Sequence, residues 1–173
     1  PRPQLFLFGA GHVGRSLCTI ASQLPLRLVA LDSRDTMRAL VPHADNVTVT
    51  GMAEPEICVP SIPRNAAVLV MTHSHELDYE LCRALLRRNE LAFVGLIGSH
   101  SKAARFRHRL RKDGVSPQAT DRLTSPIGTS GPTSKEPGVI ALAALTEILT
   151  IFEELGTKNR ADVNSQSDLV SHQ

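Results

Sequence analysis

The stretch "LFLFGAGHVGRSL", residues 5–17, places an apolar run directly before three closely spaced glycines. The glycines match the G-x-G-x-x-G pattern of a strand, a tight turn and a helix that together receive a dinucleotide. In that pattern Gly9 allows the turn, Gly11 lets a pyrophosphate approach the backbone, and Gly14 lets the helix pack close to the strand. The free N–H groups at the start of such a helix favour phosphate. The stretch therefore predicts a Rossmann-like α/β fold.

Unbroken apolar runs along the rest of the chain predict strands that are buried on both faces, as in a parallel sheet. These runs cover residues 5–8, 26–31, 66–71 and 92–97, with a weaker fifth run at 47–50. Helical patterns lie between and after them, at residues 13–24, 77–86, 101–112 and about 136–155. Strands that alternate with helices predict right-handed crossovers and a doubly wound parallel sheet in a single three-layer domain.

The end of the chain is expected to differ from the rest. Pro137 suits the first turn of the last helix, and Gly156 is a natural stop for it. We expect the ordered domain to span residues 1–155. The polar, aperiodic segment 156–173 is predicted to be a disordered tail.

Composition excludes several classes of protein. Apolar residues make up 42% of the chain and aromatic residues 3%, which predicts a globular, aliphatic core. A net charge of +2 and the shortage of aromatic residues argue against nucleic acid as a partner. No apolar run reaches about 18 residues, so no membrane span is predicted. Three widely spaced cysteines fit neither a disulfide framework nor a zinc knuckle, and they favour a reducing cytoplasm.

Asp32 follows the second predicted strand, 18 residues after Gly14. Rossmann proteins carry an acid there for the ribose hydroxyls, and its charge would repel a 2′-phosphate at 4 Å by about 4 kcal/mol. Arg34 could return about 1.5–3 kcal/mol to such a phosphate, or it could be a solvated surface arginine. The balance favours NAD over NADP, and an empty or repurposed pocket stays open as an alternative.

The stretch "MTHSHELD", residues 71–78, follows a predicted strand directly, at an edge where open α/β sheets bind ligands. Thr72 and His73 are expected to line the pocket. His73 or His75 could serve as an acid or base, but no third ligand accompanies them, and so no metal site is predicted. The alternative is an ordinary helix start with Ser74 or His75 as its cap.

The stretch "GLIGSHSK", residues 95–102, repeats this architecture. Gly98 and Ser99 could hold a phosphate or the edge of a cofactor, with Lys102 adding charge. The alternative is an ordinary turn in which Ser99 caps the following helix.

The stretch "KAARFRHRLRK", residues 102–112 of the predicted helix 101–112, carries four arginines and two lysines, with Ala103, Phe106 and Leu110 on its inward face. It is either a solvated surface or a docking surface for an acidic partner or an anionic cofactor.

The loop "SPIGTSGPTSKEP", residues 125–137, could close over a pocket. Ser125 has no adjacent base, and so it is not expected to act as a nucleophile. The cysteines are expected to be buried structural thiols. No catalytic residue is predicted.

Together, "LFGAGHVGRSL", "LDSR", "VLVMTHSHELD", "FVGLIGSHSKAARF" and "SPIGTSGPTSKEPGVIALAALTEIL" resemble the Rossmann domain of XdhC/CoxI-type proteins, over about residues 4–155. These proteins are accessory factors for xanthine dehydrogenase and related molybdenum hydroxylases. The resemblance implies a chaperone without turnover, which binds molybdenum cofactor (molybdopterin), protects it during sulfuration and passes it to the apo-dehydrogenase. The implied partners are a hydroxylase of this type and a sulfurtransferase, with a homodimer left open.

The sequence departs from the family in two places. Family members usually carry an upstream domain, and a cysteine of theirs is implicated in holding the cofactor; this chain starts at Pro1, close to its first strand, and we expect a fragment without that domain. The family often reads Cys-Pro-Ile-Gly where this chain has Ser125 before Pro-Ile-Gly. If that cysteine contacts the cofactor, a sulfur ligand is lost here.

Two other functions stay open from the residues. One is an NAD-dependent oxidoreductase, although no separate substrate domain fits in this length; the other is a regulatory nucleotide-binding module. The cofactor is accordingly expected to be NAD(P) or molybdenum cofactor. The residues expected to contact nucleotide or cofactor are Gly9, Gly11, His12, Gly14, Asp32, Thr72, His73, Gly98 and Ser99.

Overall fold

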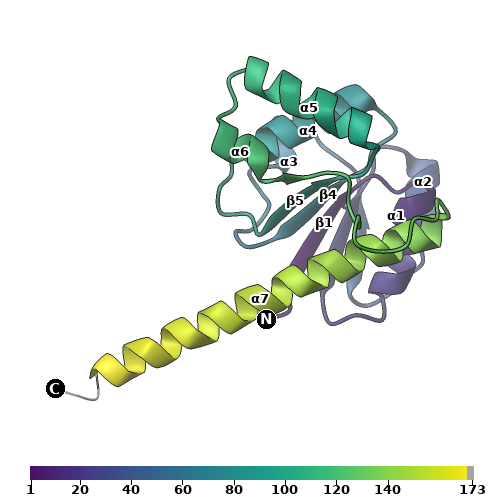
Figure 1. Cartoon of the computed structure of the whole chain (residues 1–173). Helices are drawn as coiled ribbons and strands as arrows, with labels where there is room; N and C mark the ends of the chain where they lie inside the picture. Colours follow the sequence, from purple (N-terminus) through teal and green to yellow (C-terminus); the bar gives the residue numbers. More distant parts are fainter. Residues whose placement is uncertain (171–173) are drawn as a thin grey trace.

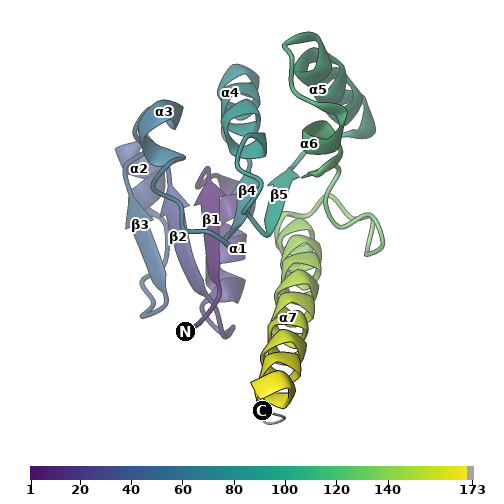
Figure 2. The ribbon, with the colours of Figure 1, turned by 90° about the vertical axis from the view of Figure 1, so that its left-hand side faces the viewer.

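The computed structural model, which describes residues 1–170 and the side chains of residues 1–163, contains one sheet of six parallel strands. The strands lie in the order β3-β2-β1-β4-β5-β6, and Figure 2 shows β3 to β5 in this order from left to right. Their bounds are β1 Gln4–Phe8, β2 Arg27–Leu31, β3 Val47–Thr50, β4 Ala67–Val70, β5 Phe93–Leu96 and β6 Leu123–Thr124. The five strands predicted from the sequence are all present, within one residue at each end.

Helices cover both faces of the sheet (Figure 1). Helices α1 and α7 pack against each other on one face, and α3 to α6 cover the other. The bounds are α1 His12–Ala21, α2 Asp35–Ala39, α3 Pro55–Cys58, α4 His75–Leu86, α5 His100–Lys112, α6 Pro117–Asp121 and α7 Pro137–Val170. The predicted three-layer, doubly wound α/β fold is confirmed.

The central strand β4 explains why the apolar runs are unbroken. Ala67 and Leu69 belong to the core beneath α1 and α7, whereas Val68 and Val70 belong to the core beneath α3, α4 and α5. All four side chains are buried, because each face of the strand is covered by helices. A polar residue at any of these positions would be removed from water without a partner, which is costly.

The strand order creates a crevice between β1 and β4. The chain leaves β1 for one face of the sheet through α1, and it leaves β4 for the other face through α4. At such a switch point the two connections diverge, and open α/β sheets bind their ligands just beyond the carboxyl ends of the two strands. The loop after β1 and the loop after β4 are the two motifs that the sequence singled out.

The last helix is longer than the sequence predicts. It was expected to stop at Gly156 before a disordered tail, but α7 continues to Val170, and its yellow half extends away from the body in Figure 1. A glycine inside a helix costs about 1 kcal/mol relative to alanine but does not end the helix, and no proline follows. The Thr157 hydroxyl donates to the Glu153 carbonyl, one turn back. Residues 171–173 lie outside the described part of the chain.

The sequence did not reveal the shortest elements. Strand β6 has two residues and helix α3 has four, too few to show a period. Strand β6 directly precedes the predicted loop 125–137 and was not predicted as a strand. No helix among the residues described is both long enough and apolar enough to span a membrane.

Candidate functional site

The glycine-rich loop is wedged between the ends of β1 and β4. Gly9 has a φ of +111°, and a Cβ there would lie 2.3 Å from the carbonyl oxygen of Met71. A Cβ on Gly14 would lie 2.3 Å from the carbonyl oxygen of Gly9. The tight turn and the close helix packing predicted for these two glycines are therefore present.

Gly11 differs from both, because a Cβ on it would meet no atom within 4 Å. The space in front of Gly11 belongs to a cleft of about 360 Å³ at the switch point. Its walls carry five basic side chains and one carboxylate: His12, Arg34, His73, His75, Lys102 and Asp78. The approach of a pyrophosphate to Gly11 stays a prediction, for which this cleft provides the room.

Asp32 does not line this cleft and is 3% exposed. Its Oδ2 accepts from the Ala10 amide at 2.8 Å and from the Arg34 guanidinium at 2.9 Å. Its Oδ1 accepts from the Arg34 amide at 2.9 Å and from Arg34 Nε at 3.0 Å. Burial alone would raise the pKa of Asp32, but these hydrogen bonds outweigh it and lower the pKa to about 2.

The four hydrogen bonds bear directly on ribose binding. A carboxylate has about four lone-pair sites, and in Asp32 all four face donors of the chain itself. A ribose hydroxyl can donate to Asp32 only after displacing one of them. Arg34 lies between its two predicted alternatives, because its side chain is 32% exposed while its guanidinium holds Asp32 through two parallel bonds.

A buried ion pair joins the other two motifs of the cleft. Lys102 Nζ donates to Asp78 Oδ2 at 2.9 Å and to the Ile97 carbonyl at 3.2 Å. Asp78 Oδ1 accepts from the amide of Thr72 at 2.8 Å and from its hydroxyl at 2.7 Å. The network connects the ends of β4 and β5 with α4 and α5. The sequence analysis gave Asp78 no role and gave Lys102 only a supporting charge. Asp78 is nevertheless the last residue of "MTHSHELD", and Lys102 is the last residue of "GLIGSHSK".

The same pair explains Gly98. A Cβ on Gly98 would lie 2.6 Å from Lys102 Cδ, so the aliphatic stem of the lysine fills the space in which a larger residue would place its side chain. The spacing between Gly98 and Lys102 in "GLIGSHSK" thus has a packing reason.

The serines of the two motifs cap helices. The Ser74 hydroxyl accepts from the Leu77 amide, and the Ser99 hydroxyl accepts from the Lys102 amide, each at 3.2 Å. The cap alternatives considered for these two serines are confirmed. His73 and His75 are exposed at the mouth of the cleft, and the His12 ring lies 3.0 Å from the Arg15 guanidinium.

A second cavity of about 590 Å³ lies between the start of α5, the loop 125–135 and the start of α7. Gly98 and Ser99 line this cavity and do not line the switch-point cleft; Ile97 lines both. The loop is anchored where the Gly128 amide donates to Glu147 Oε2 at 2.8 Å. The predicted site residues are therefore not all brought together. The switch-point cleft is lined by Gly11, His12, Gly14, Thr72 and His73, the second cavity is lined by Gly98 and Ser99, and neither is lined by Gly9 or Asp32. The predicted loop forms a wall of the second cavity.

Ser125 and the three cysteines of the described chain do not line either cavity. The Ser125 hydroxyl is buried and donates to the Leu96 carbonyl at 2.9 Å. All three cysteines are buried, as predicted, and burial raises the pKa of Cys18 to about 12 and also raises the pKa of Cys58 and of Cys82. No cysteine of the described chain lines either cavity.

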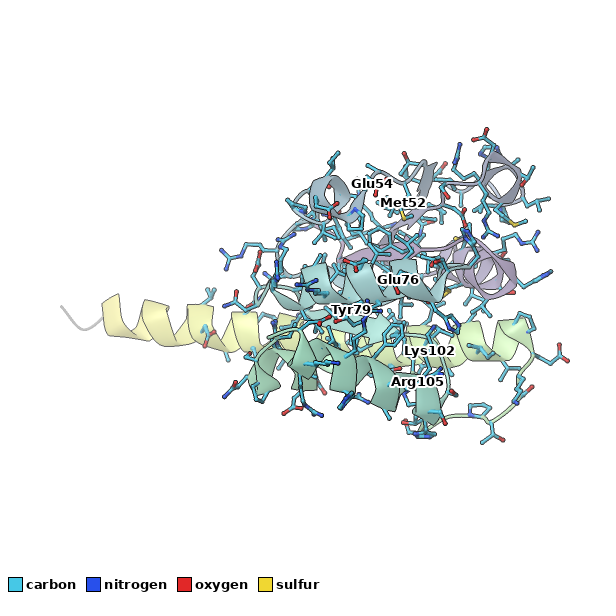
Figure 3. All side chains as sticks on the ribbon, turned by 90° about the horizontal axis from the view of Figure 1, so that it is seen from above. Met52, Glu54, Glu76, Tyr79, Lys102 and Arg105 are labelled. Atoms are coloured by element: carbon cyan, nitrogen blue, oxygen red, sulfur yellow. The ribbon has the colours of Figure 1, made fainter. Side chains whose placement is uncertain are left out.

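The basic helix α5 is partly tied to the body. Its predicted inward face is buried. Arg109 forms two bonds of 2.9 Å with Glu76 of α4 and lies over the Tyr79 ring, and Arg107 donates to the carbonyls of Leu123 and Ser125. In Figure 3, Tyr79 and Lys102 lie between the ribbons of α4 and α5. Arg105 is exposed, so the predicted solvated face holds for part of the helix only.

Comparison with known proteins places this geometry in a family. The model of the XdhC Rossmann domain matches residues 5–148. The chain belongs to this family. A Bacillus subtilis protein described as a probable xanthine dehydrogenase subunit is 31% identical over 109 residues, which cover 61% of this chain and 32% of that protein. The uncharacterized protein YqeB of Escherichia coli is 29% identical over 152 residues, 87% of this chain and 27% of that protein.

Solved structures agree with this assignment. A Bacillus halodurans structure described as a xanthine dehydrogenase has a TM-score of 0.70 and 28% identity, and the match covers 89% of this chain and 44% of that one. An oxidoreductase of Lactococcus lactis, with a TM-score of 0.52 and 16% identity, shares the fold. The chain thus spans less than half the length of the xanthine dehydrogenase-named relatives that it matches.

Proposed function

We propose that this XdhC-family chain is an accessory module for a xanthine dehydrogenase-type molybdenum hydroxylase, with no turnover of its own. Two relatives carry the name xanthine dehydrogenase, which supports a hydroxylase of that type as partner. The observation that carries the proposal is the switch-point cleft, which is open at Gly11 while Asp32 has its acceptor sites filled by the chain. A dinucleotide is thereby disfavoured, and the space for an anionic cofactor is kept.

The residues of the cleft fit molybdenum cofactor at its phosphate end. The terminal phosphate of molybdopterin would lie in the open space at Gly11, before the first turn of α1. There the helix dipole and the unpaired backbone N–H groups favour an anion. Since no cysteine of the described residues lines the cavities, the chain would hold the cofactor by its organic part. When bound, the cofactor supplies the redox-active molybdenum centre that a hydroxylase needs.

The oxidoreductase alternative is the weaker one. It rested on Asp32 as a ribose ligand and on a histidine as acid or base. Asp32 is occupied by Ala10 and Arg34, and His73 and His75 are exposed to solvent at the mouth of the cleft. Hydride transfer needs a site that excludes water. An accessory role needs only a binding site.

The test is maturation of the dehydrogenase in the organism that carries this chain. Deleting the gene is expected to leave xanthine dehydrogenase protein in place while lowering its specific activity and its sulfurated cofactor content. The intact gene is expected to restore both, and a Gly11→Val copy is not, because the valine side chain occupies the open space in front of residue 11 where the phosphate would lie. Gly138→Val is the matched control, since Gly138 also has no atom within 4 Å of a Cβ and does not line the cleft. Full activity and sulfuration in the deletion strain would overturn the proposal.

A further inference from the structure

Several hydrogen-bond donors in the switch-point cleft have no acceptor within the chain. Lys102 has three N–H donors, and two of them are used, by Asp78 and by the Ile97 carbonyl. Arg34 has five donors on its guanidinium, and the structure gives partners to two, both on Asp32. One N–H of Lys102 and three of Arg34 therefore have no hydrogen-bond partner among the described residues.

Acceptors are scarce in the same place. All four lone-pair sites of Asp32 are filled. Asp78 accepts two bonds from Thr72 and one from Lys102. The fixed charges also cancel, since each cation is paired with one carboxylate. The cleft therefore selects a ligand by an excess of donors and not by a net field, and such a ligand must be rich in acceptors.

The position of the Lys102 side chain favours a role of its ammonium group in ligand binding. The residue is 8% exposed, and its stem passes through the space left by Gly98 to reach the cleft. Burying such a pair contributes little to folding compared with apolar residues of the same size, because desolvation offsets the attraction. A stability role alone leaves the unused donor on Lys102 unexplained.

We propose that the cleft binds a phosphate ester, and that Lys102 is the side chain that selects the phosphate. A phosphate group offers only acceptors, and charge-assisted bonds from ammonium and guanidinium groups are the strong ones. Asp78 and Thr72 act as positioning residues, which hold the Lys102 ammonium at the end of β5. The inference deepens the proposed function, on which its choice of site rests, by naming the group of the ligand that is recognised.

The test is calorimetric titration of the full chain with two probes, inorganic pyrophosphate and AMP. Wild type is expected to bind pyrophosphate, and Lys102→Gln to weaken that binding at least tenfold. Lys112→Gln, an equal loss of charge at the exposed end of the same helix, is expected to change it less than twofold. Comparable affinity for AMP would assign the site to nucleotides, whereas binding of pyrophosphate alone favours the phosphate of a different ester such as a pterin; either result supports the phosphate site.

A second variant tests whether a loss of binding could be due to misfolding. In Asp78→Asn/Lys102→Met the asparagine oxygen still accepts from Thr72, and the methionine stem still fills the space beside Gly98. This variant is expected to melt cooperatively and to lose pyrophosphate binding to the same extent as Lys102→Gln. Unchanged affinity in either variant, or no binding by wild type at millimolar pyrophosphate, would overturn the inference. These outcomes are independent of dehydrogenase maturation in the deletion strain, so the two proposals can fail separately.

Discussion

Asp32 joins the glycine loop, the end of β2 and Arg34 through one carboxylate, and its hydrogen bonds make a testable pH dependence. Because its pKa is lowered from 3.8 to about 2, the folded state is stabilised above the unfolded pKa. That stabilisation is lost as the pH falls from about 4 through about 2. Asp32→Asn is expected to lower the free energy of unfolding by about 2 kcal/mol at pH 7, since hydrogen bonds to a charged group are lost.

Urea unfolding of both proteins at several pH values checks this prediction. The difference between wild type and Asp32→Asn should shrink as the pH falls from 4 to 2. Asp35→Asn is the matched control, because Asp35 is exposed and forms an exposed ion pair with Arg38 one turn along α2. It should change stability by less than about 0.5 kcal/mol. A gap for Asp32→Asn that is the same at pH 2 and pH 7 would contradict the assignment.

Substitutions at two glycines of the same loop, Gly9 and Gly11, should differ in their effect on the free energy of unfolding. Gly9→Ala places a Cβ against the Met71 carbonyl at a positive φ, and both the contact and the backbone strain are costly. We expect a loss of about 3 kcal/mol of unfolding free energy. Gly11→Ala meets open space and should cost less than about 1 kcal/mol. Chemical denaturation of the two variants measures the difference, and equal losses would show that the loop is not held as described.

At the scale of elements, the loop before α7 is tethered by one hydrogen bond. Glu147→Ala removes the acceptor of the Gly128 amide, a charge-assisted bond that contributes about 1.5–3 kcal/mol. The exchange rate of the Gly128 amide hydrogen, measured by NMR, is expected to rise at least tenfold. Glu153→Ala, an exposed acid further along the same helix, should leave that rate unchanged. An unaltered rate in Glu147→Ala would show that other contacts hold the loop.

Helix α7 should have two halves of unequal importance. Among its residues up to Val163, the buried side chains are Ala141, Ala144, Leu145 and Ile148, and every residue from Thr157 to Val163 is exposed. A chain that ends at Thr157 is therefore expected to keep its unfolding free energy within about 0.5 kcal/mol while losing helical circular dichroism. Ile148→Ala should cost about 2–5 kcal/mol. A large loss on truncation would mean that the outer half of α7 packs on the body.

At the scale of the whole molecule, the three thiols report on global unfolding. All are buried, and burial raises their pKa values, so the reactive thiolate is suppressed. We expect no thiol to react with a disulfide reagent within minutes at pH 8, and all three to react in urea. A thiol that reacts rapidly in native buffer would reveal a local opening. Cys58, at 8% exposed, is where such an opening would show first.

The sequence predicted the fold well because both of its determinants are local. Doubly covered strands require continuous apolar runs, and the Gly9 and Gly14 positions follow from backbone contacts within one strand-turn-helix unit. The motifs also pointed to Thr72 and His73, which line the cleft, and their contact with a ligand stays a prediction.

What the sequence did not reveal depends on side-chain conformation, on contacts between distant residues and on where a helix ends. The ion pair between Lys102 and Asp78 joins residues on two helices. The occupation of the Asp32 acceptor sites by Arg34 depends on the conformation of the Arg34 side chain. The assignment of Gly98 and Ser99 to a separate cavity depends on where the loop 125–135 folds back. The continuation of α7 beyond Gly156 reflects the absence of a breaker, which a propensity pattern describes poorly.

The long α7 also affects how the protein moves through solution. Its 34 residues span roughly 51 Å at 1.5 Å per residue, whereas a compact domain of about 150 residues has a radius of gyration near 15 Å. A single copy therefore experiences more friction than a sphere of 18.7 kDa and elutes early from a sizing column. An early peak by itself reports shape, and light scattering or sedimentation equilibrium is the measurement that counts copies.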